Sequence, residues 1–504
     1  MSSKKMLKAV YIISIGTIIS RLFGLFREIV SANFFGTTFI YDAFLIAFMI
    51  PNFFRGIIAE GALNAAFIPV FTEYITDENK KKESNKVINL CFTASIIITF
   101  ALFFITYILS CFIPNFLSSQ SKWFWIWTLL KFTFPYLIFI SLTSLNMGIL
   151  NAHKKFLLPS FSPIILDIFW VTSLFCFLPF FGNSVDERIF GLVIGIILGG
   201  IFQFLYLLPS VNKIGYTYKL DFDFSHPAIR KIGRLILPVI VGVAVGPINL
   251  LVDYSLAGTL FNGAVSGLWY ATRIFQLPLG VFAISISTAS LPYFSENISS
   301  KNFIQFKENF YSAMKMLFFL LVPFTFGLIL FRSEIITLLF KRGMFGSQSV
   351  EIVAFPLMFY SLGLIGYGGA SIITRAFYSF SDTSTPVKIG IISILINFVL
   401  DITLMKVLST GGIALATSAI GIVNFFFLYF YFTKKYIKLD NKKIISYFAT
   451  SLISSLVMTY VLILYKMKFG NLPLIIFLTT AIILAVIIYF LIWKLLNKIL
   501  WWNK

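Results

Sequence analysis

The fold is decided between residues 10 and 74, which read VYIISIGTIISRLFGLFREIVSANFFGTTFIYDAFLIAFMIPNFFRGIIAEGALNAAFIPVFTEY. This stretch is long and apolar enough for two membrane-spanning helices, because about 20 apolar residues cross a bilayer. Its apolar part nevertheless carries charges at Arg21, Arg27, Glu28, Asp42, Arg55 and Glu60. A charge near the bilayer centre costs roughly 3 kcal/mol, so it persists only beside a wet cavity or a charged partner. Three arginines at that depth indicate a cavity that binds an anion.

The composition of the whole chain is that of a polytopic membrane protein. Its 504 residues are 59% hydrophobic and 12% charged, with a mean hydropathy of +0.92, whereas soluble domains are about 25% charged. The three cysteines all lie in apolar runs, which argues against a disulfide framework or a metal cluster. The formal net charge of +20 could indicate nucleic-acid binding, so the location of the basic residues decides its meaning.

Hydropathy predicts fourteen membrane-spanning segments. They lie at about 9–35, 40–74, 87–113, 124–150, 158–181, 188–210, 235–261, 265–295, 310–332, 351–380, 387–407, 412–433, 444–465 and 472–494. The loops that join even to odd segments hold most of the lysines, for example at 80–82 and 434–443, and the opposite loops hold few. The positive-inside rule then places both termini in the cytoplasm. Most of the net charge therefore sets topology, and no nucleic-acid partner is expected.

The chain also repeats itself weakly at an offset of about 220 residues. Pro51 in the second segment corresponds to Pro278 in the eighth, and Pro135 in the fourth corresponds to Pro356 in the tenth. Equivalent segments run in the same direction, so the repeat axis lies along the membrane normal. Transporters built this way hold their substrate between the two halves.

We therefore predict an all-α polytopic membrane protein with 14 transmembrane helices. Two six-helix lobes form a parallel pseudo-twofold repeat, and two further helices follow. The predicted domains are an N-lobe at 1–212, a cytoplasmic linker with an amphipathic segment at 213–234, a C-lobe at 235–436, and a C-terminal helix pair with a basic aromatic tail at 437–504.

Four arginines are the candidate substrate-binding residues: Arg21, Arg27, Arg55 and Arg273. The first two are six residues apart on one helix, about 9 Å along its axis and on one broad face, so both can line one cavity wall. Guanidinium groups bind diphosphate oxygens in a bidentate manner, which suits this anion better than lysine does. The alternative is that these arginines form structural ion pairs with the acidic residues of the first stretch.

A second polar set lies in the second half of the chain. Asn397 and Asp401 are four residues apart and share a helix face. Asp253 and Thr417 lie at depths that would complete a set of oxygen ligands. Such a set suits Na⁺ or a proton. The alternative is a hydrogen-bonded network that joins helices.

Signatures of enzymes do not occur in the sequence. P-loop, HExxH and GxSxG patterns are missing, and we predict a transporter with no cofactor other than Na⁺ as a candidate coupling ion. His153 and His226 are both expected in solvated cytoplasmic loops.

Nine motifs identify a family. They are SRLFGLFRE (20–28), DAF (42–44), PNFFR (51–55), AEGALNAAFIPVF (59–71), FPY (134–136), ILN (149–151), RIFQLPLG (273–280), LP (291–292) and FYSFSDTSTPVK (377–388). In this order and spacing the chain resembles the MurJ (MviN) lipid II flippases of the multidrug/oligosaccharidyl-lipid/polysaccharide exporter superfamily. The resemblance covers nearly the whole chain. One departure is Gly56, where some members carry a second arginine.

The resemblance implies a task and a set of residues. The task is to move undecaprenyl-diphosphate-linked disaccharide pentapeptide from the inner to the outer leaflet of the bacterial cytoplasmic (inner) membrane, with the lipid tail in a groove formed by the last two helices. By position, the four arginines match the family's cavity arginines. The remaining matches are Asp42 as a required carboxylate, Glu60 in the gate region, and Asp253, Asn397, Asp401 and Thr417 as a sodium site. Glu28 is a candidate charge partner from its own position beside Arg27.

Three other functions compete with this one. The chain could export drugs or another polyprenyl-linked glycan, but a site for cationic drugs should be acidic where this one is basic. A membrane-embedded glycosyl- or acyltransferase would need catalytic groups at a membrane face, and the carboxylates here lie within the spans. A scaffold that binds lipid II without moving it is the third. The expected partners are lipid II, membrane lipids, and cell-wall synthesis or division proteins at the cytoplasmic loops.

Overall fold

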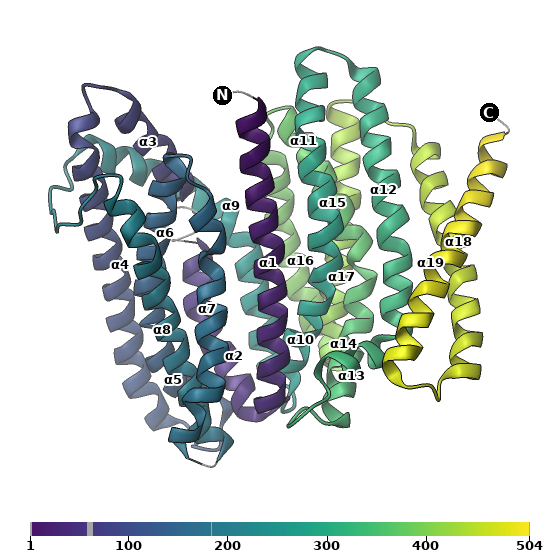
Figure 1. The fold of residues 1–504 in the computed structure, drawn as a ribbon, viewed down its shortest axis with the longest axis horizontal. Helices are drawn as coiled ribbons and strands as arrows, with labels where there is room; N and C mark the ends of the chain where they lie inside the picture. Colours follow the sequence, from purple (N-terminus) through teal and green to yellow (C-terminus); the bar gives the residue numbers. More distant parts are fainter. Residues whose placement is uncertain (1–2, 58–63, 183, 503–504) are drawn as a thin grey trace. The chain divides into compact units, whose positions relative to one another are not determined.

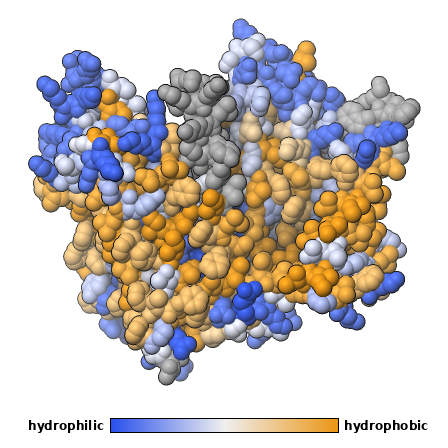
Figure 2. All heavy atoms as spheres, in the orientation of Figure 1, coloured by the Kyte–Doolittle hydropathy of each residue, from blue (hydrophilic) through white to orange (hydrophobic). Residues whose placement is uncertain are grey.

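A computed structural model describes residues 3–57, 64–182 and 184–502. Over these residues every regular element is a helix. The chain divides into two compact units, residues 1–265 and 266–504. Figure 2 shows apolar side chains along the middle of the helices and polar side chains at their ends, as expected for helices that cross a bilayer.

Unit 1 contains nine long helices among the described residues. They are α1 (Ser3–Phe35), α2 (Phe39–Phe54), α3 (Asn64–Thr76), α4 (Ser84–Phe112), α5 (Lys122–Thr133), α6 (Tyr136–Ala152), α7 (Leu157–Cys176), α8 (Val185–Asn212) and α9 (Pro227–Gly258). Short 3₁₀ turns occur at Lys81–Glu83, Ile113–Phe116 and Leu178–Phe181. The start of α1, the α3–α4 connection and the α8–α9 connection lie at the same end of this unit (Figure 1). The predicted topology requires this grouping, and which side of the membrane it faces stays a prediction.

Unit 2 contains the remaining helices. They are α10 (Ala264–Pro278), which begins at the unit boundary, α11 (Ile284–Ser299), α12 (Phe303–Leu330), α13 (Arg332–Phe340), α14 (Ser347–Leu362), α15 (Leu364–Ser379), α16 (Ser384–Leu408), α17 (Thr410–Lys435), α18 (Asn441–Phe469) and α19 (Leu474–Trp502). In Figure 1 the last two form an antiparallel hairpin, drawn in yellow-green and yellow.

The predicted fold class is confirmed. Among the described residues, ten helices are long and apolar enough to cross a membrane, or twelve if the bent pairs α5–α6 and α14–α15 each count as one span. These pairs bend by 46° and 43°. Helices α1 and α9, of 33 and 32 residues, are also long enough. Together these elements coincide with the fourteen predicted segments. The lobe boundaries at 212, 234 and 436 stay predictions.

The internal repeat is visible in how the helices are interrupted. A π-helical turn at residues 55–57 follows Pro51 closely, and another at Leu279–Ala283 follows Pro278. Proline removes one backbone hydrogen bond, so the helix relaxes locally into a wider turn. The second helical segment of each half thus carries the same interruption, and in the first half it includes Arg55.

The α8–α9 connection corrects the expectation that both histidines are solvated. His226 is 7% exposed; its Nδ1 accepts the backbone N–H of Ala228 at 3.2 Å and so caps α9. Helix α9 therefore begins at Pro227, eight residues before the predicted segment. His153, at the end of α6, is partly buried, and its Nε2 lies 3.0 Å from the hydroxyl of Tyr216. The prediction is wrong for His226 because a cap position, unlike a loop position, is packed against its helix.

We expect the contact between His153 and Tyr216 to weaken at acidic pH. Burial, and to a lesser extent Lys155, lowers the pKa of His153 from its ordinary value of 6.5. A lowered pKa means that the folded state resists protonation, so the stability of this contact is complete above about pH 6.5 and is lost as the pH falls through the folded pKa. Hydrogen exchange of residues 214–218, corrected for intrinsic rates, should therefore accelerate from pH 7.5 to pH 5. A His153→Gln variant should lose this pH dependence, and unchanged exchange in the wild type would contradict the assignment.

Candidate anion-binding site

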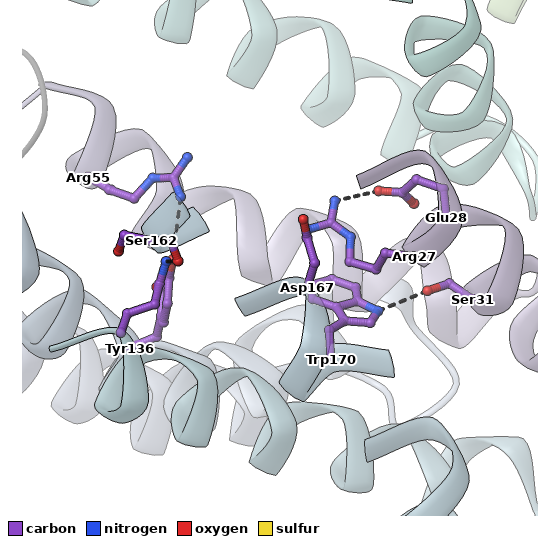
Figure 3. Close-up of polar contacts among 9 residues, drawn as sticks. Arg27, Glu28, Ser31, Arg55, Tyr136, Ser162, Asp167 and Trp170 are labelled. Carbon is purple, nitrogen blue, oxygen red and sulfur yellow. Dashed lines mark hydrogen bonds and ion pairs between the residues drawn. The ribbon is translucent and has the colours of Figure 1, made fainter. Parts of the chain in front are cut away.

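Arg27 on α1 is held between two carboxylates. Its Nη2 donates to Oε1 of Glu28 at 2.6 Å, and its Nη1 donates to Oδ1 of Asp167 on α7 at 2.8 Å (Figure 3). The exposed fractions of the three side chains are 11%, 0% and 8%. Ion pairs this far from water are screened weakly, and each member left alone would be costly. The predicted ion pair with Glu28 is therefore present, and Asp167 adds a second one that was not predicted.

The ring of Trp170 stacks against the guanidinium group of Arg27. The guanidinium carbon of Arg27 lies 4.5 Å from the centroid of the Trp170 ring, a cation–π contact. The indole Nε1 donates to Oγ of Ser31 at 2.9 Å, and Phe44 and Phe48 of α2 pack edge-on against the ring. The indole is thereby locked in one orientation, so the guanidinium plane has a fixed support.

Glycines on α8 bring α7 into place. A Cβ atom on Gly199 would lie 2.8 Å from Cδ1 and 3.2 Å from Cα of Leu166, the residue before Asp167. A Cβ on Gly195 would lie 2.3 Å from the Cβ of Ser173. Only residues without a side chain allow this close approach of two helices. Because α1 also packs on α7, the α8 glycines set the position of Asp167 opposite Arg27.

This arrangement can exchange counter-ions. The guanidinium of Arg27 donates to two carboxylates, so both of its terminal nitrogens already have an acidic acceptor. An anionic ligand that reaches Arg27 must therefore displace at least one carboxylate. The Nε of Arg27 is buried and makes no hydrogen bond to the described residues, which leaves one donor unused. The site thus combines a paired arginine with remaining capacity for an acceptor.

The other predicted arginines have different surroundings. Arg55 reaches the hydroxyl of Tyr136 at the start of α6, at 3.4 Å (Figure 3). Arg21 is partly buried on α1. Arg273 on α10 belongs to unit 2, and its guanidinium carbon lies 4.3 Å from the ring centroid of Trp269. Arg27 and Arg273, one in each unit, are therefore both stacked on a tryptophan. Whether the four arginines bind one ligand stays a prediction.

Asp42 is paired with a lysine. Its Oδ2 accepts from Nζ of Lys122 at 3.1 Å and from the backbone N–H of Gly263 at 2.8 Å. Lys122 also donates to the carbonyl of Phe261 at 3.4 Å. The φ of Gly263 is +95°, a conformation that other residues adopt only with strain. This cluster, which we call the α2–α5 clamp, joins the starts of both helices to the loop after α9. Glu60 lies outside the described residues.

The predicted oxygen set is divided between the units. In unit 2 the Nδ2 of Asn397 donates to Oδ2 of Asp401 at 2.7 Å, and both side chains are buried. Thr417 lies on α17, which packs against their helix α16; its carbonyl accepts from the hydroxyl of Tyr367 at 3.1 Å. Asp253 is buried on α9 in unit 1. The described residues contain no group of three His, Cys, Asp or Glu side chains that could hold a metal. A cation here would therefore also need amide, hydroxyl or carbonyl oxygens.

Two charged residues of the site were missed from the sequence. Asp167 is a lone acid in the predicted span 158–181, and Lys122 precedes the predicted span 124–150. An ionisable residue inside a span is by itself a sign of function. That rule could have identified Asp167, whereas the partner of Lys122 required the structure.

The comparisons with known proteins agree with one another. A family model described as lipid II flippase MurJ matches residues 31–484. A probable lipid II flippase MurJ from Vibrio cholerae is 33% identical over 443 residues, which are 85% of this chain and 83% of that protein. A solved structure of lipid II flippase MurJ in an inward closed conformation matches with a TM-score of 0.82 and 30% identity, over 97% of this chain and 99% of that one. An inward-facing MATE multidrug transporter of the MOP superfamily matches with a TM-score of 0.62 and 15% identity, over 84% and 97%. This last likeness shows the fold alone.

The α2–α5 clamp yields a double-mutant test. Lys122→Met leaves the carboxylate of Asp42 buried without its cation, so we expect a loss of roughly 3–5 kcal/mol in unfolding free energy in detergent. Asp42→Asn combined with Lys122→Met removes both charges, and the double variant should be more stable than Lys122→Met alone. As a matched control, Lys443→Met breaks the more exposed pair with Glu308 and should cost only about 0–1 kcal/mol. Equal losses for the two lysine variants would show that the clamp contributes no more than a surface pair.

Proposed function

The chain belongs to the MurJ family of lipid II flippases, and we propose that it carries lipid II from the cytoplasmic to the outer leaflet by alternating access. The observation that carries this proposal is Arg27, a buried arginine neutralised by Glu28 and Asp167. Lipid II presents a diphosphate, whose oxygens match the guanidinium fork. A buried arginine with exchangeable counter-ions fits an anionic cargo that must be taken up and also released.

The binding step follows from the charges. The diphosphate takes the place of a carboxylate at Arg27, with Arg21 and Arg55 of the same unit as the other candidate contacts. The stacking of Arg27 on Trp170 holds the guanidinium plane in place while its partners change. When the cargo leaves, Glu28 and Asp167 close on Arg27 again, so no arginine is left as an isolated buried charge.

The lipid tail stays in the bilayer along α18 and α19. Large apolar side chains on these helices are exposed, among them Ile475, Ile482, Val486, Tyr460 and Leu464. In water such a surface would be unfavourable, but it matches acyl chains. The predicted topology places both termini in the cytoplasm of a bacterium, with the protein in its inner membrane.

The coupling ion that we propose is Na⁺. Asn397 and Asp401 supply buried amide and carboxylate oxygens on one helix face, and Thr417 of the same unit is the proposed further ligand. A membrane potential contributes about 2.3 kcal/mol per charge per 100 mV, so a bound cation would let the potential act on the carrier.

Replacement of Arg27 should impair flipping. Arg27→Ala removes the guanidinium that we propose binds the diphosphate. Each charge-assisted hydrogen bond that it would donate to phosphate is worth about 1.5–3 kcal/mol, so we expect a fall in flipping rate of at least tenfold. Arg27→Lys keeps the charge but not the fork and should be intermediate. The measurement is the fraction of lipid II in each leaflet of cells depleted of the wild-type protein, at matched membrane levels of the variants. Arg342→Ala, in an exposed loop, is the matched control. Wild-type flipping by correctly inserted Arg27→Ala would refute the arginine assignment.

The sodium proposal has a separate test. In vesicles containing the purified protein, lipid II flipping should increase when K⁺ is replaced by Na⁺, and Asp401→Asn should abolish the increase. Asp186→Asn, at an exposed position, should retain it. If Asp401→Asn still responds to Na⁺, this site does not bind the coupling ion, although flipping itself could remain.

A further inference from the structure

Residues 216–224, in the connection between α8 and α9, form an extended segment that is hydrogen-bonded to α4. We call this segment the strap. The backbone N–H groups of residues 217, 219 and 221 donate to side-chain oxygens of Asn85, Asn89 and Thr93, at 3.1, 3.0 and 3.0 Å. These acceptors are one helical turn apart, about 6 Å along α4. Alternate residues of an extended chain are about 6.6 Å apart. The two spacings match, so the strap runs alongside α4 for roughly 12 Å. In Figure 1 it belongs to the teal loop beside α4.

The strap then reverses. The N–H of Phe224 bonds to the carbonyl of Phe222 at 2.9 Å, and the N–H of Asp223 bonds to Oδ1 of Asp221 at 3.0 Å, which together make a tight turn. After the turn the carboxylate of Asp223 pairs with Lys86 at 2.7 Å, and His226 lies 3.4 Å from Glu83. The strap therefore runs along α4 from Asn85 to Thr93, and the chain then turns back to contact Lys86 and Glu83 near the start of α4. Residues 220–222 form the tip.

The inner side of the strap is tied down. Tyr216 is buried against Phe71, with a ring separation of 5.8 Å. Tyr218 stacks on Phe92 at 4.4 Å and donates to Asn146 of α6. The strap is therefore held by polar and apolar contacts along its length, and its tip is presented in a fixed position.

The tip and the residues just after it expose three apolar side chains, which alternate with Asp221 and Asp223. Leu220 is 61% exposed, Phe222 is 65% exposed and Phe224 is 38% exposed. Burying a side chain of this kind is worth about 1.5–3 kcal/mol, so three neighbouring ones left in water are unfavourable. Just beyond Thr93, α4 exposes Ile97, Ile98 and Phe100, residues of its apolar, membrane-spanning part. The tip is thus continuous with a surface that faces lipid.

Lysines surround the end of α4 where the strap begins. Lys80, Lys81 and Lys82 precede α4 together with Asp77, Glu78 and Glu83, and Lys80 pairs with Asp77. Lys219 is exposed on the strap itself. Such side chains reach towards anionic headgroups while apolar neighbours enter the acyl boundary. We propose that the strap is a membrane-dipping anchor, whose residues Leu220, Phe222 and Phe224 insert into the leaflet at the α3–α4 end of unit 1. The occupant of this surface is lipid. Because His226 caps α9 directly after the strap, the anchor fixes the start of α9 at the level of the headgroups.

Depth-dependent quenching tests the anchor. In a background with Cys91, Cys111 and Cys176 replaced by serine or alanine, Phe222→Cys and Lys219→Cys are each labelled with the same small fluorophore. The full-length purified chain is placed in vesicles of phosphatidylethanolamine and phosphatidylglycerol. We expect the label at 222 to be quenched severalfold more than the label at 219 by lipids brominated on the acyl chain, and severalfold less by aqueous iodide. Leu220→Cys, labelled in the same way, should behave like Phe222→Cys.

Two results would overturn the proposal. Equal iodide quenching at 219 and 222, in a chain whose hydrogen exchange in the strap is unchanged, would show that the tip lies in water. Protection of position 222 in native membranes but not in the purified vesicles would show that a protein covers the tip. Neither measurement depends on flipping, so the anchor can fail while the proposed function stands.

Discussion

The structure of unit 1 depends on the neutralisation of Arg27. An arginine whose side chain is 11% exposed needs partners, and Arg27 has Glu28 from its own helix and Asp167 from α7. This requirement fixes the register of α1 against α7, because a shift of one residue along either helix would leave a buried charge unpaired. The glycines of α8 allow α7 to pack closely on that helix, and this packing places Asp167 where it reaches Arg27 on α1. Electrostatics and helix packing therefore specify the same arrangement.

Other buried acids of the described residues are also held by polar partners. Asp42 is fully buried and is paired with Lys122 at 3.1 Å, which connects the starts of α2 and α5. In unit 2 the buried Asp401 accepts from Asn397 at 2.7 Å. These pairs sit at helix starts or on helix faces where apolar packing alone would allow neighbouring registers. Polar pairs of this kind give a membrane bundle specificity that its uniformly apolar surfaces do not provide.

Much of the fold could be predicted from the sequence, because crossing a bilayer imposes a length and a hydropathy that are visible in single segments. The correspondence of Pro51 and Pro278 was visible in the sequence, but the π-helical turns that follow them were not predicted. Pairing was harder to predict. Glu28 is next to Arg27 and was named as a partner, but Asp167 is 140 residues away and Lys122 is 80 residues from Asp42. His226 was misplaced because capping and burial depend on packing against Glu83 and Tyr74.

Two carboxylates on one arginine serve a carrier better than one or none. A bare buried arginine would bind a diphosphate so strongly that release would be slow, and in the empty carrier it would be an isolated charge. With Glu28 and Asp167 both present, one can stay on the guanidinium while the other yields to phosphate, so the arginine is never without a partner. The stacking on Trp170 persists through this exchange because it does not depend on which anion is bound. The free-energy change when phosphate replaces a carboxylate on Arg27 is therefore small, because both anions make similar hydrogen bonds to the guanidinium. A small free-energy change lets the site both bind the cargo and release it.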